Sequence, residues 1–305
     1  LVLDPFGVIH SGYSTRMSPY TISDDYVTVE KYMNLKAEGK KHHSFIFGNS
    51  KAGAFTLKDL QGFGFSEDIY NMASPGESIY NVKEKIRLIQ ESGDTIDHVL
   101  LVLDDQIFRN IENSHPFFQG PSYIHHPEIS TSSYWDFQVR NLMYFYSDLY
   151  FVSYIDHRFM GEWKPYMKGQ IQQLRATENY IDSNSNQVVK LKPSECEFAV
   201  EKAYIVKDED YHPNQVFNLN SRQLGYLKDI SIALGKTKVY AVYGPTTSSY
   251  EMKEIIQTVD SILTPTGTLD ARAFRIESTL SKDCYWDDAK HYSQYFGQLL
   301  LDSLD

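Results

Sequence analysis

The stretch Phe45-Ile-Phe-Gly-Asn-Ser50 decides the fold that we expect, because a short apolar run stops there at three turn-forming residues. The run predicts a buried strand over 43–47. Gly48 and Asn49 then predict a turn that delivers Ser50 beyond the end of this strand. Because glycine, asparagine and serine are common in turns, the stretch alone predicts a strand and a turn rather than a nucleophile.

Strands and helices are predicted to alternate along most of the remaining chain. The clearest buried strand is Val99–Leu103, an all-apolar and partly β-branched run. Periodicity predicts the other elements, which are helices over 52–60, 77–91, 220–234, 250–263 and 294–304 and strands over 68–72, 238–243 and 271–276. Strands separated by helices favour a three-layer α/β/α fold around a central, mostly parallel sheet.

Four polar or glycine residues follow predicted strands. They are Ser50, Gly76, Asp104 and Gly244. Because ligands of parallel sheets bind beyond the carboxyl ends of the strands, we expect a functional site at the edge where these residues lie.

The alternation breaks between 108 and 213, where proline, histidine and aromatic clusters dominate. We interpret 1–305 as a single domain and 108–213 as an inserted subdomain that covers the edge of the sheet. A purely structural role for the insertion stays open. Its aromatic side chains Tyr123, Trp135 and Trp163 could stack on sugar rings or fill a core.

Composition excludes some classes of partner and cofactor. The net charge of −11 argues against a nucleic-acid partner, whose phosphates need a basic face. Cys196 and Cys284 lack metal-ligand spacing, as do the histidine pairs at 42–43 and 125–126, so we expect no metal and no other cofactor. The two cysteines could form one disulfide or stay unpaired.

The sequence contains no apolar run of roughly 18 residues and no visible signal peptide. It begins at Leu1 without a methionine. We therefore expect a processed or truncated piece from which a membrane anchor or targeting segment has been removed.

Near the other end of the chain, Asp288 lies three residues before His291, just ahead of the predicted helix at 294–304. Serine, histidine and a carboxylate are the groups that acyl transfer needs. The serine attacks, the histidine takes its proton, and the carboxylate holds the imidazole in the right tautomer.

Gly48-Asn49-Ser50 after the first strand and Asp288-x-x-His291 near the end resemble two sequence blocks of the SGNH (GDSL-like) hydrolase superfamily. The resemblance implies a flavodoxin-like sheet and a catalytic triad. In that triad Ser50 is the nucleophile, His291 the general base and Asp288 its orienting carboxylate. Asp287 is a weaker candidate for the last role, because it lies one residue too early.

The resemblance also implies an oxyanion hole, but this chain departs from the family there. Gly76 matches the glycine of the second block, whereas the third strand ends in Leu103-Asp-Asp-Gln106, without the asparagine of the third block. One missing donor costs about 10²–10³ in rate. The Ser50 N–H, Asn71 or Gln106 could supply the contact, while a carboxylate directed at the oxyanion would oppose catalysis.

The missing asparagine, Asp4-Pro5-Phe6 and the terminal Asp-x-x-His-Tyr-Ser resemble membrane-anchored bacterial branches of the superfamily. These move acyl groups onto or off cell-envelope polymers, as in alginate O-acetylation and teichoic-acid D-alanylation. The resemblance implies an extracytoplasmic location, periplasmic or at the cell surface, with a membrane anchor in the full-length protein.

The function that we expect is that of a serine esterase or O-acyltransferase. Its substrate would be an acylated carbohydrate or small ester, with O-linked groups such as acetyl transferred through an acyl-Ser50 intermediate. Two alternatives stay open. One is a catalytically silent glycan-binding or assembly protein on the same fold. The other is a lipase or thioesterase, with apolar residues over 143–152 lining an acyl groove.

Overall fold

The computed structural model describes residues 24–74, 76–109, 126–129, 134–146, 150–161, 164, 179–181, 185, 188–190, 204–207, 215–244, 250–272, 274–277 and 294–304. The chain divides into two compact units. Unit 1 comprises Leu1–Lys40 and Asn113–Leu191, and unit 2 comprises Lys41–Glu112 and Lys192–Asp305. Unit 1 thus contains much of the span predicted as an insertion, together with an N-terminal part that the sequence pattern did not join to it.

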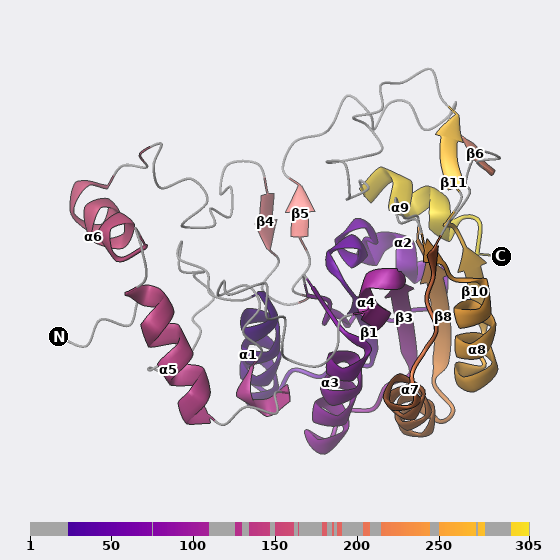
Figure 1. The fold of residues 1–305 in the computed structure, drawn as a ribbon, viewed down its shortest axis with the longest axis horizontal. Helices are drawn as coiled ribbons and strands as arrows, with labels where there is room; N and C mark the ends of the chain where they lie inside the picture. The colour runs from indigo at the N-terminus through magenta and orange to yellow at the C-terminus, as the bar shows by residue number, and fades with distance from the viewer. Residues whose placement is uncertain are drawn as a thin grey trace. The chain divides into compact units, whose positions relative to one another are not determined.

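Unit 2 is built on a five-stranded parallel sheet (Figure 1). In spatial order its strands are β10 (Gly267–Asp270), β8 (Lys238–Tyr243), β3 (His98–Leu103), β1 (Ser44–Gly48) and β2 (Ile69–Asn71). The predicted α/β class and parallel sheet are therefore confirmed. The chain runs outward from β1 to β2 and then returns to the other side of β1 at β3. In open α/β sheets, such a reversal of strand order opens a crevice at the carboxyl ends of the strands.

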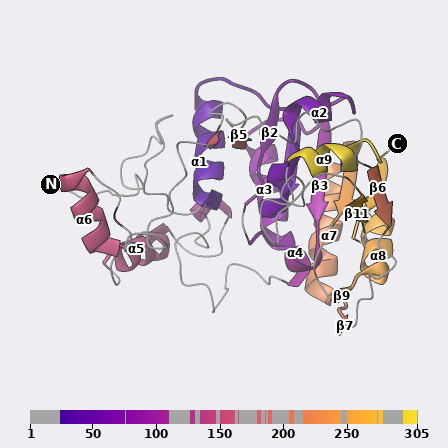
Figure 2. The ribbon, with the colours of Figure 1, turned by 90° about the horizontal axis from the view of Figure 1, so that it is seen from above.

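Helices cover both faces of this sheet (Figures 1 and 2). On one side α7 (Ser221–Leu234) packs against both α3 (Ile79–Glu91) and α8 (Lys253–Leu263). On the other side lie the 3-10 helix η1 (Ser50–Ala54), α2 (Leu57–Gln61) and α9 (Gln294–Leu301), and α9 contacts both of its neighbours. The short helix α4 (Asp105–Arg109) follows β3.

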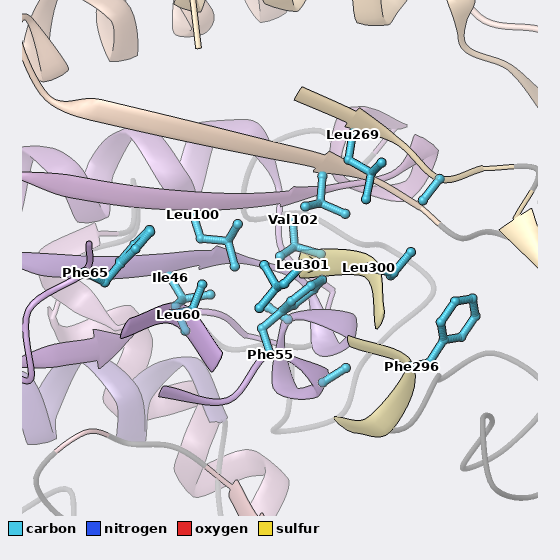
Figure 3. Close-up of a cluster of buried hydrophobic side chains, with 14 of the residues drawn as sticks. Ile46, Phe55, Leu60, Phe65, Leu100, Val102, Leu269, Phe296, Leu300 and Leu301 are labelled. Atoms are coloured by element: carbon cyan, nitrogen blue, oxygen red, sulfur yellow. The ribbon is translucent and has the colours of Figure 1, made fainter. Parts of the chain in front are cut away.

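The core between the sheet and α9 draws on alternate residues of the central strands, as the period of a strand requires (Figure 3). Ile46 of β1 and Leu100 and Val102 of β3 lie in this cluster. The helical side contributes large apolar side chains, each about 1.5–3 kcal/mol when fully buried. These are Phe55, Leu60, Phe296, Leu300 and Leu301.

Some predicted elements differ from the structure in their bounds. The helix expected over 52–60 is broken into η1 and α2, because Thr56 starts a new helix by accepting a hydrogen bond from Asp59 N. The strand expected over 271–276 is wrong in its bounds. β10 ends at Asp270, and β11 (Phe274–Glu277) pairs antiparallel with β6 (Tyr204–Lys207) outside the main sheet. β10 is an edge strand with a single buried side chain, Leu269, so it carries little apolar signal.

A further strand pair in unit 2 joins β7 (Gln215–Val216) to β9 (Tyr250–Glu251) in parallel. β9 takes the first two residues of the helix predicted over 250–263, so the helix α8 begins at Lys253 instead.

Unit 1 contains α1 (Asp24–Ala37), η3 (Pro127–Ile129), α5 (Tyr134–Phe145), α6 (Tyr150–Met160) and an antiparallel pair of β4 (Asn179–Ile181) with β5 (Val188–Lys190). Tyr26 of α1 stacks on His126 and on Phe137 of α5. The His126 ring also lies 3.1 Å from Glu30 of α1 through its Nε2 atom. These contacts hold the three segments together around a small aromatic core.

Candidate active site

The end of β1 brings two backbones unusually close. Gly48 has φ +150°, and a Cβ at this position would lie 2.5 Å from Val102 O of the neighbouring strand. Only glycine fits such an approach without displacing the partner strand. Gly48 therefore has a steric reason to stand before the Asn49–Ser50 turn.

Asn49 fixes the turn that follows. Its side chain is buried and caps η1 by accepting a hydrogen bond from Lys51 N at 3.0 Å. Its Nδ2 donates to Asp104 Oδ2 at 2.8 Å. Ser50 is the first residue of η1 and is exposed. The predicted nucleophile thus lies on an anchored turn at the carboxyl end of β1, open to solvent.

Asp104, at the carboxyl end of β3, joins three segments of the site. The side chain is 2% exposed. Its Oδ2 accepts from Asn49 and also from Lys51 Nζ at 2.6 Å. Its Oδ1 accepts from Ile107 N at 3.1 Å, which caps α4. The carboxylate that stands in place of the expected asparagine is therefore bonded to the Asn49–Lys51 turn on one side and to α4 on the other.

The segment after β2 lies against the same turn. Met72 N donates to Ile46 O at 2.8 Å, and Ser74 N donates to Gly48 O at 3.1 Å. Asn71, a predicted oxyanion donor, is 6% exposed and accepts from Ala73 N through its Oδ1, so it shapes this turn. Two residues beyond Ser74, Gly76 adopts φ +70°.

A fully buried ion pair supports this segment. Lys85 of α3 and Glu77 both have side chains at 0% exposure, with Lys85 Nζ 2.5 Å from Glu77 Oε2. The same ammonium donates to Met72 O at 2.9 Å and to Ser74 Oγ at 2.8 Å. These three hydrogen bonds therefore hold the segment between β2 and α3.

Sequence reasoning missed Lys85, although a signal was present. Lys85 occupies a position on the apolar face of α3, three residues after Val82 and four before Ile89. A lysine there needs buried acceptors, because an unpaired charge in a core is strongly disfavoured. Lys51 was missed as well, because its partner Asp104 is distant in sequence.

The remaining predicted site residues divide into two groups. Gln106 lies in the first turn of α4 with an exposed side chain. Asp288, His291 and Asp287 lie outside the described residues, as do Cys196 and Cys284. The triad and the disulfide therefore stay predictions.

The element that follows the Asp288–His291 segment is nevertheless described. α9 begins at Gln294 and packs directly on η1. A Cβ on Gly297 would lie 2.2 Å from Ala54 O, so the two backbones touch at this glycine. The helix three residues beyond His291 is thus seated on the helix that Ser50 begins.

A second polar cluster lies farther along the same edge of the sheet. Tyr243, the last residue of β8, donates to Asp260 Oδ1 of α8 at 2.8 Å. Burial raises the pKa of the Asp260 carboxyl, and the nearby Asp270 acts in the same direction, against the hydrogen bonds that Asp260 accepts. Burial also raises the pKa of the Tyr243 hydroxyl, with Asp260 adding to the effect. The Tyr243 hydroxyl therefore keeps its proton at neutral pH and can donate it to Asp260.

Comparisons with known proteins do not assign the chain to a family. No family model matches it, and neither the curated proteins nor the solved structures include a significant match.

Within the described ranges, no helix has the length and apolar character needed to cross a bilayer. Across the part of the chain that the structure describes, no three His, Cys, Asp or Glu side chains gather in a way that could hold a metal ion.

Proposed function

We propose that this protein is an SGNH-type serine esterase or O-acyltransferase. The observation that carries the proposal is the position of Ser50. It is exposed on a turn at the carboxyl end of β1, beside the reversal of strand order, and both of its chain neighbours are anchored to Asp104. An acyl-transfer nucleophile needs this combination of an open side chain and a fixed backbone.

The reaction would proceed by double displacement. Ser50 Oγ attacks the acyl carbon while His291 takes its proton, and Asp288 orients the imidazole. The tetrahedral oxyanion would accept hydrogen bonds from the backbone N–H groups of Ser50 and Gly76. Collapse of this intermediate expels the alcohol, which regains the proton from His291, and leaves acyl-Ser50. Water or a sugar hydroxyl then attacks the acyl-enzyme with His291 again as base.

Two contacts support this assembly of the site. Ser74 N donates to Gly48 O, which holds the segment leading to Gly76 against the nucleophile turn. α9 packs on η1 and directly follows the segment that carries Asp288 and His291. Asn71 and Gln106 are the weaker candidates for oxyanion donors, since the first shapes its own turn and the second lies on α4 with its side chain exposed.

The substrate that we propose is an O-linked acyl group, such as acetyl, on an extracytoplasmic glycan or a small ester. This part of the proposal rests on the resemblance of the two sequence blocks, as does the membrane-anchored, cell-envelope location. The exposed aromatic side chain of Trp135 in unit 1, 76% accessible, is compatible with a sugar-stacking surface.

A catalytically silent glycan-binding protein is the second candidate, and Asp104 is the observation that favours it. A carboxylate occupies the end of the third strand, where an asparagine donor was expected. Its bonds to Lys51 and Asn49 count against this second candidate, because they reduce the repulsion that the carboxylate would exert on an oxyanion.

Intact-mass spectrometry after treatment with a small fluorophosphonate separates the two candidates. We expect one adduct on the parent chain and none on Ser50→Ala, whereas Ser303→Ala, which removes an exposed hydroxyl at the end of α9, keeps the adduct. His291→Ala should slow adduct formation by a factor of about 10³ or more. A folded parent chain without any adduct would refute the catalytic proposal and leave the glycan-binding protein.

A further inference from the structure

Ser50 is flanked by two side chains that bind the same oxygen atom. Asn49 Nδ2 and Lys51 Nζ both donate to Asp104 Oδ2, at 2.8 and 2.6 Å. We call these three residues the Asp104 clamp. Because the clamp ties the residues on both sides of Ser50 to Asp104, it restricts the backbone of the serine relative to the end of β3.

The clamp also balances charge. Asp104 is 2% exposed, and a buried carboxylate is strongly disfavoured unless it is paired and hydrogen-bonded. Asn49 and the Ile107 N–H are neutral donors, so they satisfy lone pairs without cancelling the charge. Among the residues that the structure describes, Lys51 is the only cation paired with Asp104.

We propose that Lys51 and Asp104 are positioning residues for Ser50 that act as one charge-compensated unit. The inference rests on the proposed function. Lys51 neutralises the carboxylate that stands at the third-strand position, so that it does not oppose the negative charge developing beside Ser50. Asp104 in turn fixes the orientation of the Ser50 turn against β3 and α4.

Loss of Lys51 and loss of the Asp104 charge should therefore have different effects on the acylation of Ser50. Removing Lys51 leaves a buried, uncompensated carboxylate next to the reacting serine, which opposes the oxyanion and favours the protonated form of a neighbouring base. Removing the charge of Asp104 by Asp104→Asn keeps an oxygen acceptor for the Ile107 N–H. The damage from losing Lys51 should thus be relieved when the carboxylate is also removed.

The experiment measures the rate of Ser50 acylation by p-nitrophenyl acetate between pH 5.5 and 9 for the parent chain, K51M, D104N and K51M/D104N. We expect K51M to slow acylation at least about tenfold and to move the midpoint of the pH profile upward by about half a unit or more. K51M/D104N should recover most of the rate and return the midpoint. K58M, which removes an exposed lysine of α2, is the matched control and should change neither quantity.

Thermal unfolding of the same variants separates this role from a merely structural one. A pair that only stabilises the fold would lower the melting temperature in K51M without moving the pH midpoint. That result overturns the inference, as does a K51M/D104N variant no faster than K51M. A parent chain that does not acylate at all refutes the proposed function and this inference with it. If the parent chain acylates and K51M behaves like K58M, only the inference fails.

Discussion

The contact between α9 and η1 makes a sharp prediction about one glycine. In Gly297→Ala the new methyl group would lie 2.2 Å from Ala54 O and 2.7 Å from Ala54 C, both backbone atoms. Carbon contacts normally lie near 3.5 Å, so the helix must shift by about 1 Å or more. Overpacking of this kind costs about 1–3 kcal/mol. The higher helix propensity of alanine returns only about 1 kcal/mol.

A second helical glycine provides the control. Gly225 of α7 has no atom within 4 Å of its hypothetical Cβ, so Gly225→Ala gains the propensity term without a clash. We expect Gly225→Ala to raise the free energy of unfolding by about 0.5–1 kcal/mol. Gly297→Ala should lower it by up to about 2 kcal/mol, which is the overpacking cost of about 1–3 kcal/mol less the propensity gain of about 1 kcal/mol.

Thermal unfolding followed by far-UV circular dichroism measures both variants. At roughly 2–4 °C per kcal/mol, the melting temperature of Gly297→Ala should end about 1–12 °C below that of Gly225→Ala. Gly297→Ala should also slow the acylation of Ser50, because the same clash displaces η1. If Gly297→Ala were as stable as Gly225→Ala, the close seating of α9 on η1 would be refuted.

Two further predictions concern buried charges. Lys85→Met leaves Glu77 buried without its partner and should lower the free energy of unfolding by about 3–5 kcal/mol. The double variant Lys85→Met/Glu77→Gln should recover part of that loss, as measured by urea titration. Equal urea midpoints for the single and double variants would contradict the pairing. Asp260→Asn keeps an acceptor for Tyr243 and removes a carboxyl whose pKa burial raises above its ordinary value. The stability of the variant relative to the parent chain should therefore increase as pH rises through this raised pKa, and the variant should stay the more stable of the two above it. A stability difference that shrinks over that pH range would show that burial does not penalise the ionised form.

The central part of the fold could be predicted because its signals are local. β1 and β3 are continuous apolar runs between turn residues, and α3 shows its apolar face at helical spacing. The parallel sheet follows from the alternation of strands with helices, whereas the order of its strands was not predicted. The exposed Ser50 on a turn beyond β1 could likewise be read from Gly48-Asn49-Ser50.

The pairings that make the candidate site specific could not be predicted in the same way. Lys51 and Asp104 are ordinary polar residues in the sequence, and only the parallel register of β1 with β3 brings them together. Lys85 meets Glu77 and the carbonyl of Met72 for the same reason, because α3 returns across the sheet. The edge strand β10 has one buried side chain, so tertiary pairing rather than periodicity determines its bounds.

The packing of α9 on η1 determines when one face of the sheet becomes covered during synthesis. The apolar residues of η1 and α2 leave the ribosome long before Phe296, Leu300 and Leu301, which cover them and lie far later in the chain. Until then one face of the nascent sheet stays uncovered, and nascent chains in this condition are targets for chaperones and for aggregation. Because the proposed base His291 lies just before this helix in the sequence, the chain would acquire its proposed reactivity only after that segment has been made.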